Sequence, residues 1–339
     1  MELILFSCFA AAFLVTMILV PKWVRKAVRM GLVGGDMNKP GRPKVAEAGG
    51  ITVIAGAVFG ILLYIFLKTF YFYSGVGLIE IFAVLTTILL AGFIGFIDDI
   101  LGWKAGIRHS TKVLSTIPIA IPLAAVNVGE STMMLPFFGP VNFGVLFPLV
   151  LIPLGIIGAT NGYNMLAGYN GLEAGMGVII LSTMGVIAWM TGLSWVSMIS
   201  FCIVFALLAF FVHNRPPAKI FPGDSLTYST GAAIACIAIL GNMEKVALLL
   251  FIPYFFDALM FIRFRFIDRV KSVEAFGKVS PDGSLDLPHD KIYDFTHLAI
   301  GVVKRVKGKA YEKDVIAAIF AFEALLAMTG IYLVIAGVL

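Results

Sequence analysis

The chain has 339 residues, of which 60% are hydrophobic and only 13% are charged, and its mean hydropathy is +0.99. A soluble domain would carry about 25% charged residues, so the composition excludes an ordinary soluble globular protein. Apolar runs of about 17 to 25 residues, the length that crosses a bilayer, recur along the whole sequence. We therefore predict a single all-α membrane domain over residues 1–339, with the lipid bilayer as its partner and no nucleic acid.

Ten apolar segments predict a bundle of about ten transmembrane helices. The fourth segment is short and contains Pro118 and Pro122, which would kink a helix. In chain order the segments are Leu3–Val20, Ile51–Leu67, Ile79–Ile97, Val113–Val126, Phe143–Ala159, Met176–Met190, Trp195–Val212, Leu226–Leu240, Val246–Ile262 and Val315–Val338.

The distribution of basic residues predicts the orientation of this bundle. With ten spans, every Lys and Arg except Lys68 and Lys245 falls into loops on one face. Basic residues concentrate on the cytoplasmic side of membrane proteins. Deleting the fourth span would move the basic residues downstream of it to the other face. We therefore predict that both termini lie outside and that the basic loops lie in the cytoplasm.

Polar residues cluster within the same loops. Asp98 and Asp99 end the third span, and two carboxylates at such short range need a nearby cation if both are to stay ionised. Residues 160–175, with the sequence TNGYNMLAGYNGLEAG, carry several Asn, Gly and Glu residues but no Lys or Arg. Asp224 precedes the eighth span, where a helix N-cap is the alternative interpretation.

Together these residues form an oxygen-rich set on one face, accompanied by cations. Oxygen ligands without clustered His or Cys suit Mg²⁺, with Mn²⁺ as a substitute. Positive side chains beside a Mg²⁺ site indicate a phosphorylated substrate, so the sequence predicts phosphoryl transfer at the cytoplasmic membrane surface. The oxygen-bearing residues are Asp98, Asp99, Asn161, Asn164, Asn170, Glu173 and Asp224, and the cations are Lys39, Arg42, Lys112 and Arg269.

Four of these loops, in this order, resemble the polyprenyl-phosphate N-acetylhexosamine-1-phosphate transferase family. They read NKPGRPKVAEAGG, FIDD at Phe96–Asp99, NGYNMLAGYNGLEAG and FPGDSLTYSTG. Their form is similar to the eukaryotic and archaeal branch that makes dolichyl diphosphate N-acetylglucosamine, more than to the bacterial muramoyl-peptide branch. The resemblance implies transfer of a HexNAc 1-phosphate from a UDP-sugar to a membrane polyprenyl or dolichyl phosphate, with release of UMP.

The resemblance also implies a role for each residue that matches a family motif. Asn164 and Asp224 would hold Mg²⁺ on the donor diphosphate. Asp98 and Asp99 match the acidic pair near the acceptor phosphate, and Lys112 matches a lysine that contacts phosphate. We assign these three residues to catalysis.

The predicted substrate-binding residues lie in four loops. Phe221 would stack on the uracil, Asn170 would contact it, and Glu47 lies in the loop that closes over the nucleoside. The full predicted set is Lys39, Glu47, Asn161, Asn170, Glu173, Phe221, Gly223 and Arg269.

One segment departs from the family pattern. Eukaryotic members carry an Arg-His-Arg cluster in the last cytoplasmic loop, whereas this chain has RFRFIDRVKSVEAFGK and PHDKIYDFTH. Arg269, Lys271 and His289 are the candidates to replace that cluster. The identity of the N-acetylhexosamine is left open by this departure.

A transporter of nucleotide sugars or lipid-linked sugars is the alternative function. It would need coupling residues near the bilayer midplane, where Asp257 and Glu323 are the carboxylates available. We interpret both as interior hydrogen-bonding groups and favour the enzyme. We expect a multi-pass protein of the cell membrane if the source is archaeal, or of the endoplasmic reticulum if it is eukaryotic, and a homodimer is compatible with either.

Overall fold

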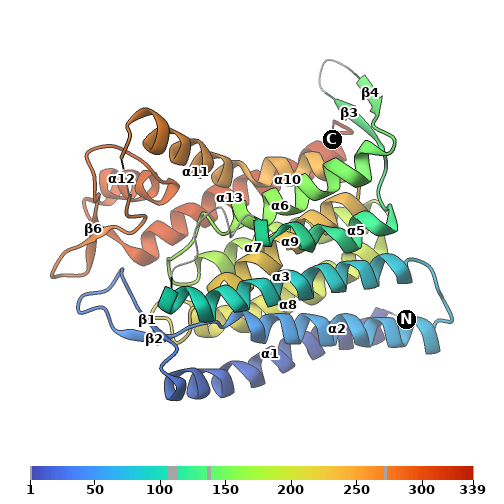
Figure 1. Ribbon diagram of the computed structural model, residues 1–339, viewed down its shortest axis with the longest axis horizontal. Coiled ribbons are helices and arrows are strands. Elements are labelled where there is room, and N and C mark those ends of the chain that lie inside the picture. Colours follow the sequence, from blue (N-terminus) through green and yellow to red (C-terminus); the bar gives the residue numbers. More distant parts are fainter. Residues whose placement is uncertain (1, 106–113, 136–138, 271–272, 339) are drawn as a thin grey trace.

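The computed structural model describes residues 2–105, 114–135, 139–270 and 273–338, and these form a bundle of long helices (Figure 1). Seven described helices are long and apolar enough to cross a membrane, so the chain is a polytopic membrane helix bundle. They are α1 (Glu2–Met30), α2 (Gly50–Phe70), α3 (Leu78–Ala105), α7 (Leu172–Met190), α8 (Ser194–Asn214), α9 (Gly223–Leu240) and α13 (Glu312–Ile335).

The remaining predicted spans correspond to shorter or bent helices. The ninth corresponds to α10 (Glu244–Leu250) followed by α11 (Ile252–Ile262) and the π-helical turn η3 (Arg263–Ile267), with a bend of 62° that makes an eighth span if the pair crosses together. The fourth and fifth correspond to two shorter apolar helices, each with prolines in its first turns. These are η1 (Ile117–Ala120) with α5 (Ile121–Val126), and η2 (Phe147–Leu151) with α6 (Ile152–Tyr163).

The loops gather at two opposite ends of the bundle. Both termini lie at one end, together with the antiparallel hairpin of β3 (Thr132–Leu135) and β4 (Gly139–Asn142) (Figure 1). The antiparallel pair β1 (Val33–Gly35) and β2 (Lys44–Ala46) lies at the other end. A chain whose two termini lie at the same end crosses the bundle an even number of times. The ten predicted spans are compatible with this.

The basic segment between the last two predicted spans folds into a small unit at the end opposite the termini. It contains a three-stranded antiparallel sheet of β5 (Lys278–Val279), β6 (Ser284–Asp286) and β7 (Ala310–Tyr311). The amphipathic helix α12 (Phe295–Lys307) packs beside it and begins where the Asp294 carboxylate accepts the Thr296 N–H at 2.7 Å. The all-α prediction therefore describes the membrane bundle and misses these short strands.

Helix α9 is the most enclosed of the seven helices and packs against α2, α3, α6, α7, α8 and α10. Two glycines allow this close approach. A Cβ on Gly50 of α2 would lie 2.1 Å from the Leu226 nitrogen, and one on Gly95 of α3 would lie 2.3 Å from the Asp224 carbonyl oxygen. The first turn of α9 is therefore held between α2 and α3.

Candidate active site

A cavity of about 250 Å³ opens where α6, α7 and α9 meet the loop that follows β2. Its wall combines carboxylates and carboxamides with aromatic rings. Seven predicted site residues line it, and they are Glu47, Asn164, Asn170, Glu173, Phe221, Gly223 and Asp224. The structure therefore brings together residues that lie as far as 177 positions apart in the sequence.

The first turn of α9 forms one side of this cavity and is capped by Asp99. Its carboxylate accepts the backbone N–H of Asp224 at 2.6 Å and that of Ser225 at 3.2 Å. These amides have no partner within the helix, and the helix dipole favours an anion there. The capping carboxylate of α9 is thus that of Asp99, and the N-cap interpretation of Asp224 is wrong, because Asp224 lies within the first turn.

Gly223 is required for this capping contact. Its φ of +70° lies in the left-handed region, which an L side chain adopts at a cost. A Cβ at this position would also lie 2.5 Å from Oδ2 and 2.6 Å from Oδ1 of Asp99. Gly223 therefore acts by letting the Asp99 carboxylate reach the helix start.

Asn164 and Asp224 face the cavity from two different helices. Asn164 ends α6, and its Oδ1 accepts the Thr227 hydroxyl at 2.7 Å, which ties it to α9. One carboxylate and one amide oxygen suit Mg²⁺, which commonly takes one or two protein ligands beside phosphate oxygens and water. Among the described residues no three His, Cys, Asp or Glu side chains are placed to hold a metal alone. This donor set therefore fits an ion shared with a phosphorylated ligand.

The loop from residue 164 to 171 is held in place by Glu173. Its Oε1 accepts the Gly168 N–H at 2.7 Å, and the side chain is buried. Gly168 has a φ of +101°, and its missing Cβ leaves room for the ring of Phe276, which also lines the cavity. Phe276 comes from the last loop, in the segment that departs from the family pattern. Sequence reasoning gave it no role.

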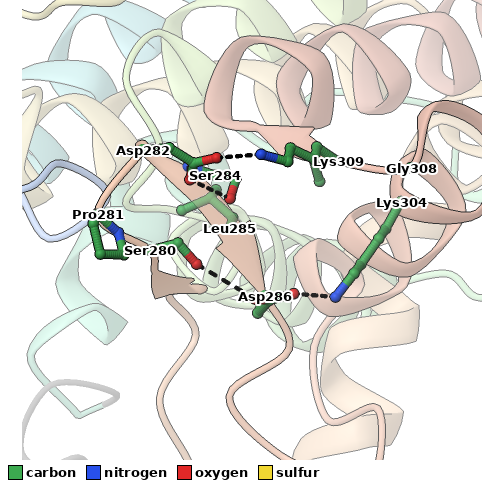
Figure 2. A pocket seen from close by; sticks show the side chains of 10 residues that line it. Ser280, Pro281, Asp282, Ser284, Leu285, Asp286, Lys304, Gly308 and Lys309 are labelled. Carbon is green, nitrogen blue, oxygen red and sulfur yellow. Dashed lines mark hydrogen bonds and ion pairs between the residues drawn. The ribbon is translucent and has the colours of Figure 1, made fainter.

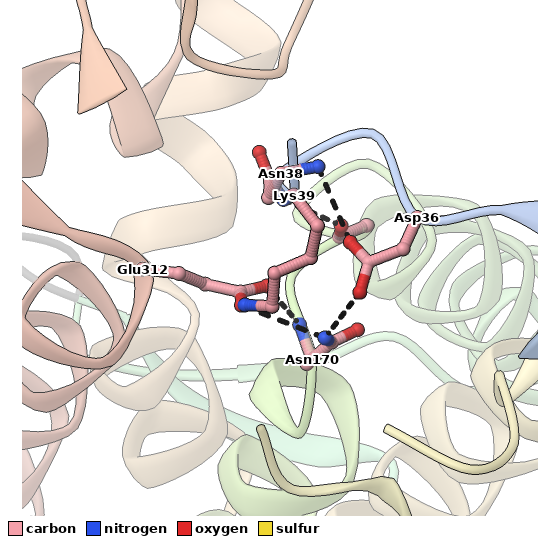
Figure 3. Close-up of polar contacts among 6 residues, drawn as sticks. Asp36, Asn38, Lys39, Asn170 and Glu312 are labelled. Carbon is pink, nitrogen blue, oxygen red and sulfur yellow. Dashed lines mark hydrogen bonds and ion pairs between the residues drawn. The ribbon is translucent and has the colours of Figure 1, made fainter. Parts of the chain in front are cut away.

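A second network fixes Asn170 at the cavity (Figure 3). Its Nδ2 donates to Asp36 Oδ2 at 2.8 Å and to Glu312 Oε2 at 3.5 Å, and its backbone N–H donates to Glu312 Oε1 at 3.0 Å. Lys39, predicted to bind substrate, forms an ion pair with Glu312. Asp36 and Glu312 were missed as site residues, although Asp36 begins the NKPGRPK loop and Glu312 begins the last helix.

Other predicted site residues lie away from the cavity or outside the described residues. Asn161 donates to the Thr116 hydroxyl at 3.0 Å and to the Ile157 carbonyl at 2.8 Å. Asp98 is buried beside Asp99 in α3. Arg269 is exposed after η3, in a left-handed conformation with a φ of +53°. Lys112 and Lys271 lie outside the described residues.

The interior carboxylates considered for a transporter do not line the cavity. Asp257 accepts the Phe295 N–H at 2.6 Å and so fixes the start of α12, which confirms its predicted interior hydrogen bond. Glu323 is fully buried in α13. Neither carboxylate is placed to share a ligand with Asp224.

A larger cavity of about 460 Å³ lies between β6 and α12 (Figure 2). Its two lysines are already paired, Lys309 with Asp282 at 2.6 Å and Lys304 with Asp286. The hydrogen bond with Lys309 lowers the pKa of Asp282. Because these charges compensate one another at an exposed surface, this cavity is a weaker candidate for binding a polyanion.

Burial raises the pKa of Glu47, which lies in the cavity wall. A raised pKa means that the Glu47 contribution to stability is present below its ordinary pKa and is lost as pH rises through the folded value. Glu47→Gln should therefore raise the thermal unfolding midpoint by roughly 2 °C at pH 7 and by less at pH 4. Thermal unfolding in detergent at both pH values measures this. An equal change at both would contradict it.

An apolar helix bundle with an oxygen-rich, aromatic-lined cavity at one end is compatible with an integral membrane transferase that acts on phosphorylated substrates. Residues 81–242 match glycosyl transferase family 4. The chain is 35% identical over 314 residues to a protein of Saccharolobus solfataricus named as a UDP-N-acetylglucosamine–dolichyl-phosphate N-acetylglucosaminephosphotransferase, with 92% of this chain and 91% of the relative covered.

Two further relatives agree. A protein of Sulfolobus acidocaldarius with the same name is 33% identical over 323 residues, covering 94% of this chain and 93% of the relative. A phospho-N-acetylmuramoyl-pentapeptide-transferase of Listeria monocytogenes is 32% identical over 255 residues, covering 73% and 78%. The chain belongs to the polyprenyl-phosphate N-acetylhexosamine-1-phosphate transferase family, which confirms the resemblance seen in its loops.

Proposed function

We propose that this protein transfers N-acetylglucosamine 1-phosphate from UDP-N-acetylglucosamine to a dolichyl or other polyprenyl phosphate and releases UMP. The observation that carries the proposal is the single cavity that combines Asp224 and Asn164 with Phe221 and Asn170. The first pair suits a diphosphate with Mg²⁺, and the second suits an aromatic base. Similarity over more than nine-tenths of the chain to two proteins named for this reaction supports it.

In the proposed reaction an oxygen of the lipid phosphate forms a bond to the β-phosphorus of the donor. The bond from that phosphorus to the bridging oxygen breaks, and its electron pair leaves with UMP. Asn164 and Asp224 would hold Mg²⁺, which would supply positive charge to offset the charge of the diphosphate. The acceptor phosphate is largely ionised near neutral pH, its second pKa being about 6, so a strong general base is not needed.

The protein therefore acts mainly by positioning the two substrates. Asp99 holds the start of α9, which sets the place of Asp224, and Asn164 is tied to the same helix through Thr227. Fixing reacting groups in line removes much of the entropic cost of the bimolecular step. On this proposal Asp99 is a positioning residue for α9, rather than a group that takes a proton.

We also propose that the cavity faces the cytoplasm and that the protein resides in the cell membrane. Among the described residues, the basic segments between α1 and α2 and between α11 and α13 lie at the end of the bundle that carries β1, β2 and α12 (Figure 1), and basic residues favour the cytoplasmic side. A charged UDP-sugar cannot enter the bilayer, and the acceptor lipid cannot leave it. A site at the membrane surface is accessible to both substrates.

The purified protein with radiolabelled UDP-N-acetylglucosamine, a polyprenyl phosphate and Mg²⁺ should release UMP and form labelled lipid. Chelation by EDTA should reduce the rate at least about 100-fold, because the diphosphate charge is then uncompensated, and added Mg²⁺ or Mn²⁺ should restore it. UDP-N-acetylmuramoyl-pentapeptide should not replace the donor. Turnover that persists in EDTA would contradict the metal site, and saturable uptake into liposomes without turnover would indicate a transporter.

A further inference from the structure

The carboxamide of Asn170 is held in one orientation by two acids from distant parts of the chain (Figure 3). Asp36 lies in the loop between β1 and β2, and Glu312 begins α13. Both accept from Nδ2 of Asn170, at 2.8 Å and 3.5 Å. An ionised carboxylate only accepts hydrogen bonds, so both acids must face the NH₂ group.

The orientation is enforced by burial and by countercharge. Asp36, Asn170 and Glu312 are each no more than 4% exposed, so water cannot compensate for a wrongly turned amide. Turning the amide by 180° would place its oxygen against two carboxylates in a medium of low polarity. Lys39 pairs with Glu312 and supplies the positive charge that the two acids require.

The backbone of Asn170 is fixed by the same residues. Its N–H donates to Glu312 Oε1 at 3.0 Å, so the residue cannot shift along the cavity wall without breaking a buried hydrogen bond. Asn38 secures the other side of the loop, because its Nδ2 donates to the Gly168 carbonyl at 3.1 Å and its N–H donates to Asp36 at 3.2 Å. The carboxamide therefore presents Oδ1 to the cavity that Asn170 lines.

We propose that Asp36 and Glu312 set the nucleobase specificity of the site by locking Asn170 with its acceptor toward the donor substrate. This inference rests on the proposed function. A uracil ring presents an imide N–H, which an amide oxygen accepts. A cytosine ring presents a lone pair at the same ring position, which the locked oxygen rejects. Phe221 and Phe276 in the same wall contact either base through its face and cannot tell them apart.

The test compares kcat/KM for UDP- and CDP-N-acetylglucosamine in the wild type, Asp36→Asn and Glu312→Gln. Each substitution keeps the side-chain shape but supplies a group that can donate as well as accept, which releases the amide. We expect the preference for the uracil donor to fall about 10-fold or more in each variant, since sites built for a buried hydrogen bond discriminate strongly. An unchanged ratio in both variants would overturn the inference.

Lys309→Gln is the matched control. It removes an ion pair with an acid, Asp282, and leaves the hydrogen bonds of the Asn170 amide in place. We expect its donor ratio to match that of the wild type. A ratio that falls equally in Lys309→Gln would show that the ratio responds to any loss of stability, which would overturn the specificity role.

Calorimetric binding of UMP and CMP to the same proteins separates this inference from the proposed function. If the wild type transfers no sugar, the proposed function fails, whereas the binding preference for UMP and its loss in Asp36→Asn and Glu312→Gln still support the locked amide. If the wild type transfers sugar and all variants keep the UMP preference, only the inference fails.

Discussion

Asp224→Asn should reduce transfer roughly 1,000-fold while the protein remains folded. The substitution removes the one carboxylate that α9 presents to the cavity beside Asn164. It leaves the helix start intact, because Asp99 bonds to the backbone of residue 224 and not to its side chain. Initial rates of UMP release, with circular dichroism as a check of folding, measure the effect.

Asp282→Asn is the control for this prediction. Asp282 is also an acid in a cavity wall, but it is paired with Lys309 in the small unit that contains β5, β6, β7 and α12 (Figure 2). Its replacement should leave the rate of UMP release within about twofold of the wild type, as for most surface changes. If both variants retained full activity, Asp224 would have no part in binding the metal or the diphosphate.

Gly223→Ala should reduce transfer about 100-fold or more and lower the thermal unfolding midpoint by several degrees. An L residue at a φ of +70° costs about 1–2 kcal/mol. The added Cβ also displaces the Asp99 carboxylate, whose two hydrogen bonds cap α9, and a lost cap costs about 0.5–2 kcal/mol. Thermal unfolding and kcat/KM should change together.

Gly308→Ala separates the steric effect from the backbone effect. Gly308 ends α12 at a φ of +78°, and a Cβ there would have nothing within 4 Å. This variant should show only the backbone cost and should keep its rate of transfer. Equal losses of activity in both variants would mean that the contact with Asp99 is not what Gly223 protects.

The sequence predicts most of the bundle and much of the cavity because both leave local patterns. Long apolar runs mark the long helices, and polar motifs mark the loops that line the cavity. Asn164, Asn170 and Asp224 were predicted from such motifs, and the structure places all three in one wall. Asn161, three residues before Asn164 in the same motif, instead ties α6 to Thr116, because it lies inside the helix whereas Asn164 lies at the helix end.

The residues that sequence reasoning missed act through pairings across the fold. Glu312 has no local feature that distinguishes it from Asp314, yet Glu312 accepts hydrogen bonds from Asn170 and Asp314 pairs with Lys307. The capping role of Asp99 is likewise invisible, because its amide partners lie 125 and 126 residues away. The strands β5, β6 and β7 have two or three residues each, too short for an alternating pattern to predict them.

The enclosure of α9 has a consequence for how the protein is made. Its first turns carry the buried hydroxyl side chains of Ser225, Thr227, Ser229 and Thr230. Transfer of this helix into lipid alone is therefore less favourable than for the other long helices. Of the helices that pack against it, α2, α3, α6, α7 and α8 precede it in the chain, and the short helix α10 follows it. When α9 leaves the ribosome, most of the helices against which it packs have already been synthesised. The turn that carries Asp224 therefore enters the bundle after most of the helices that hold it, and the cavity is complete only when the later residues Phe276 and Glu312 have also been added.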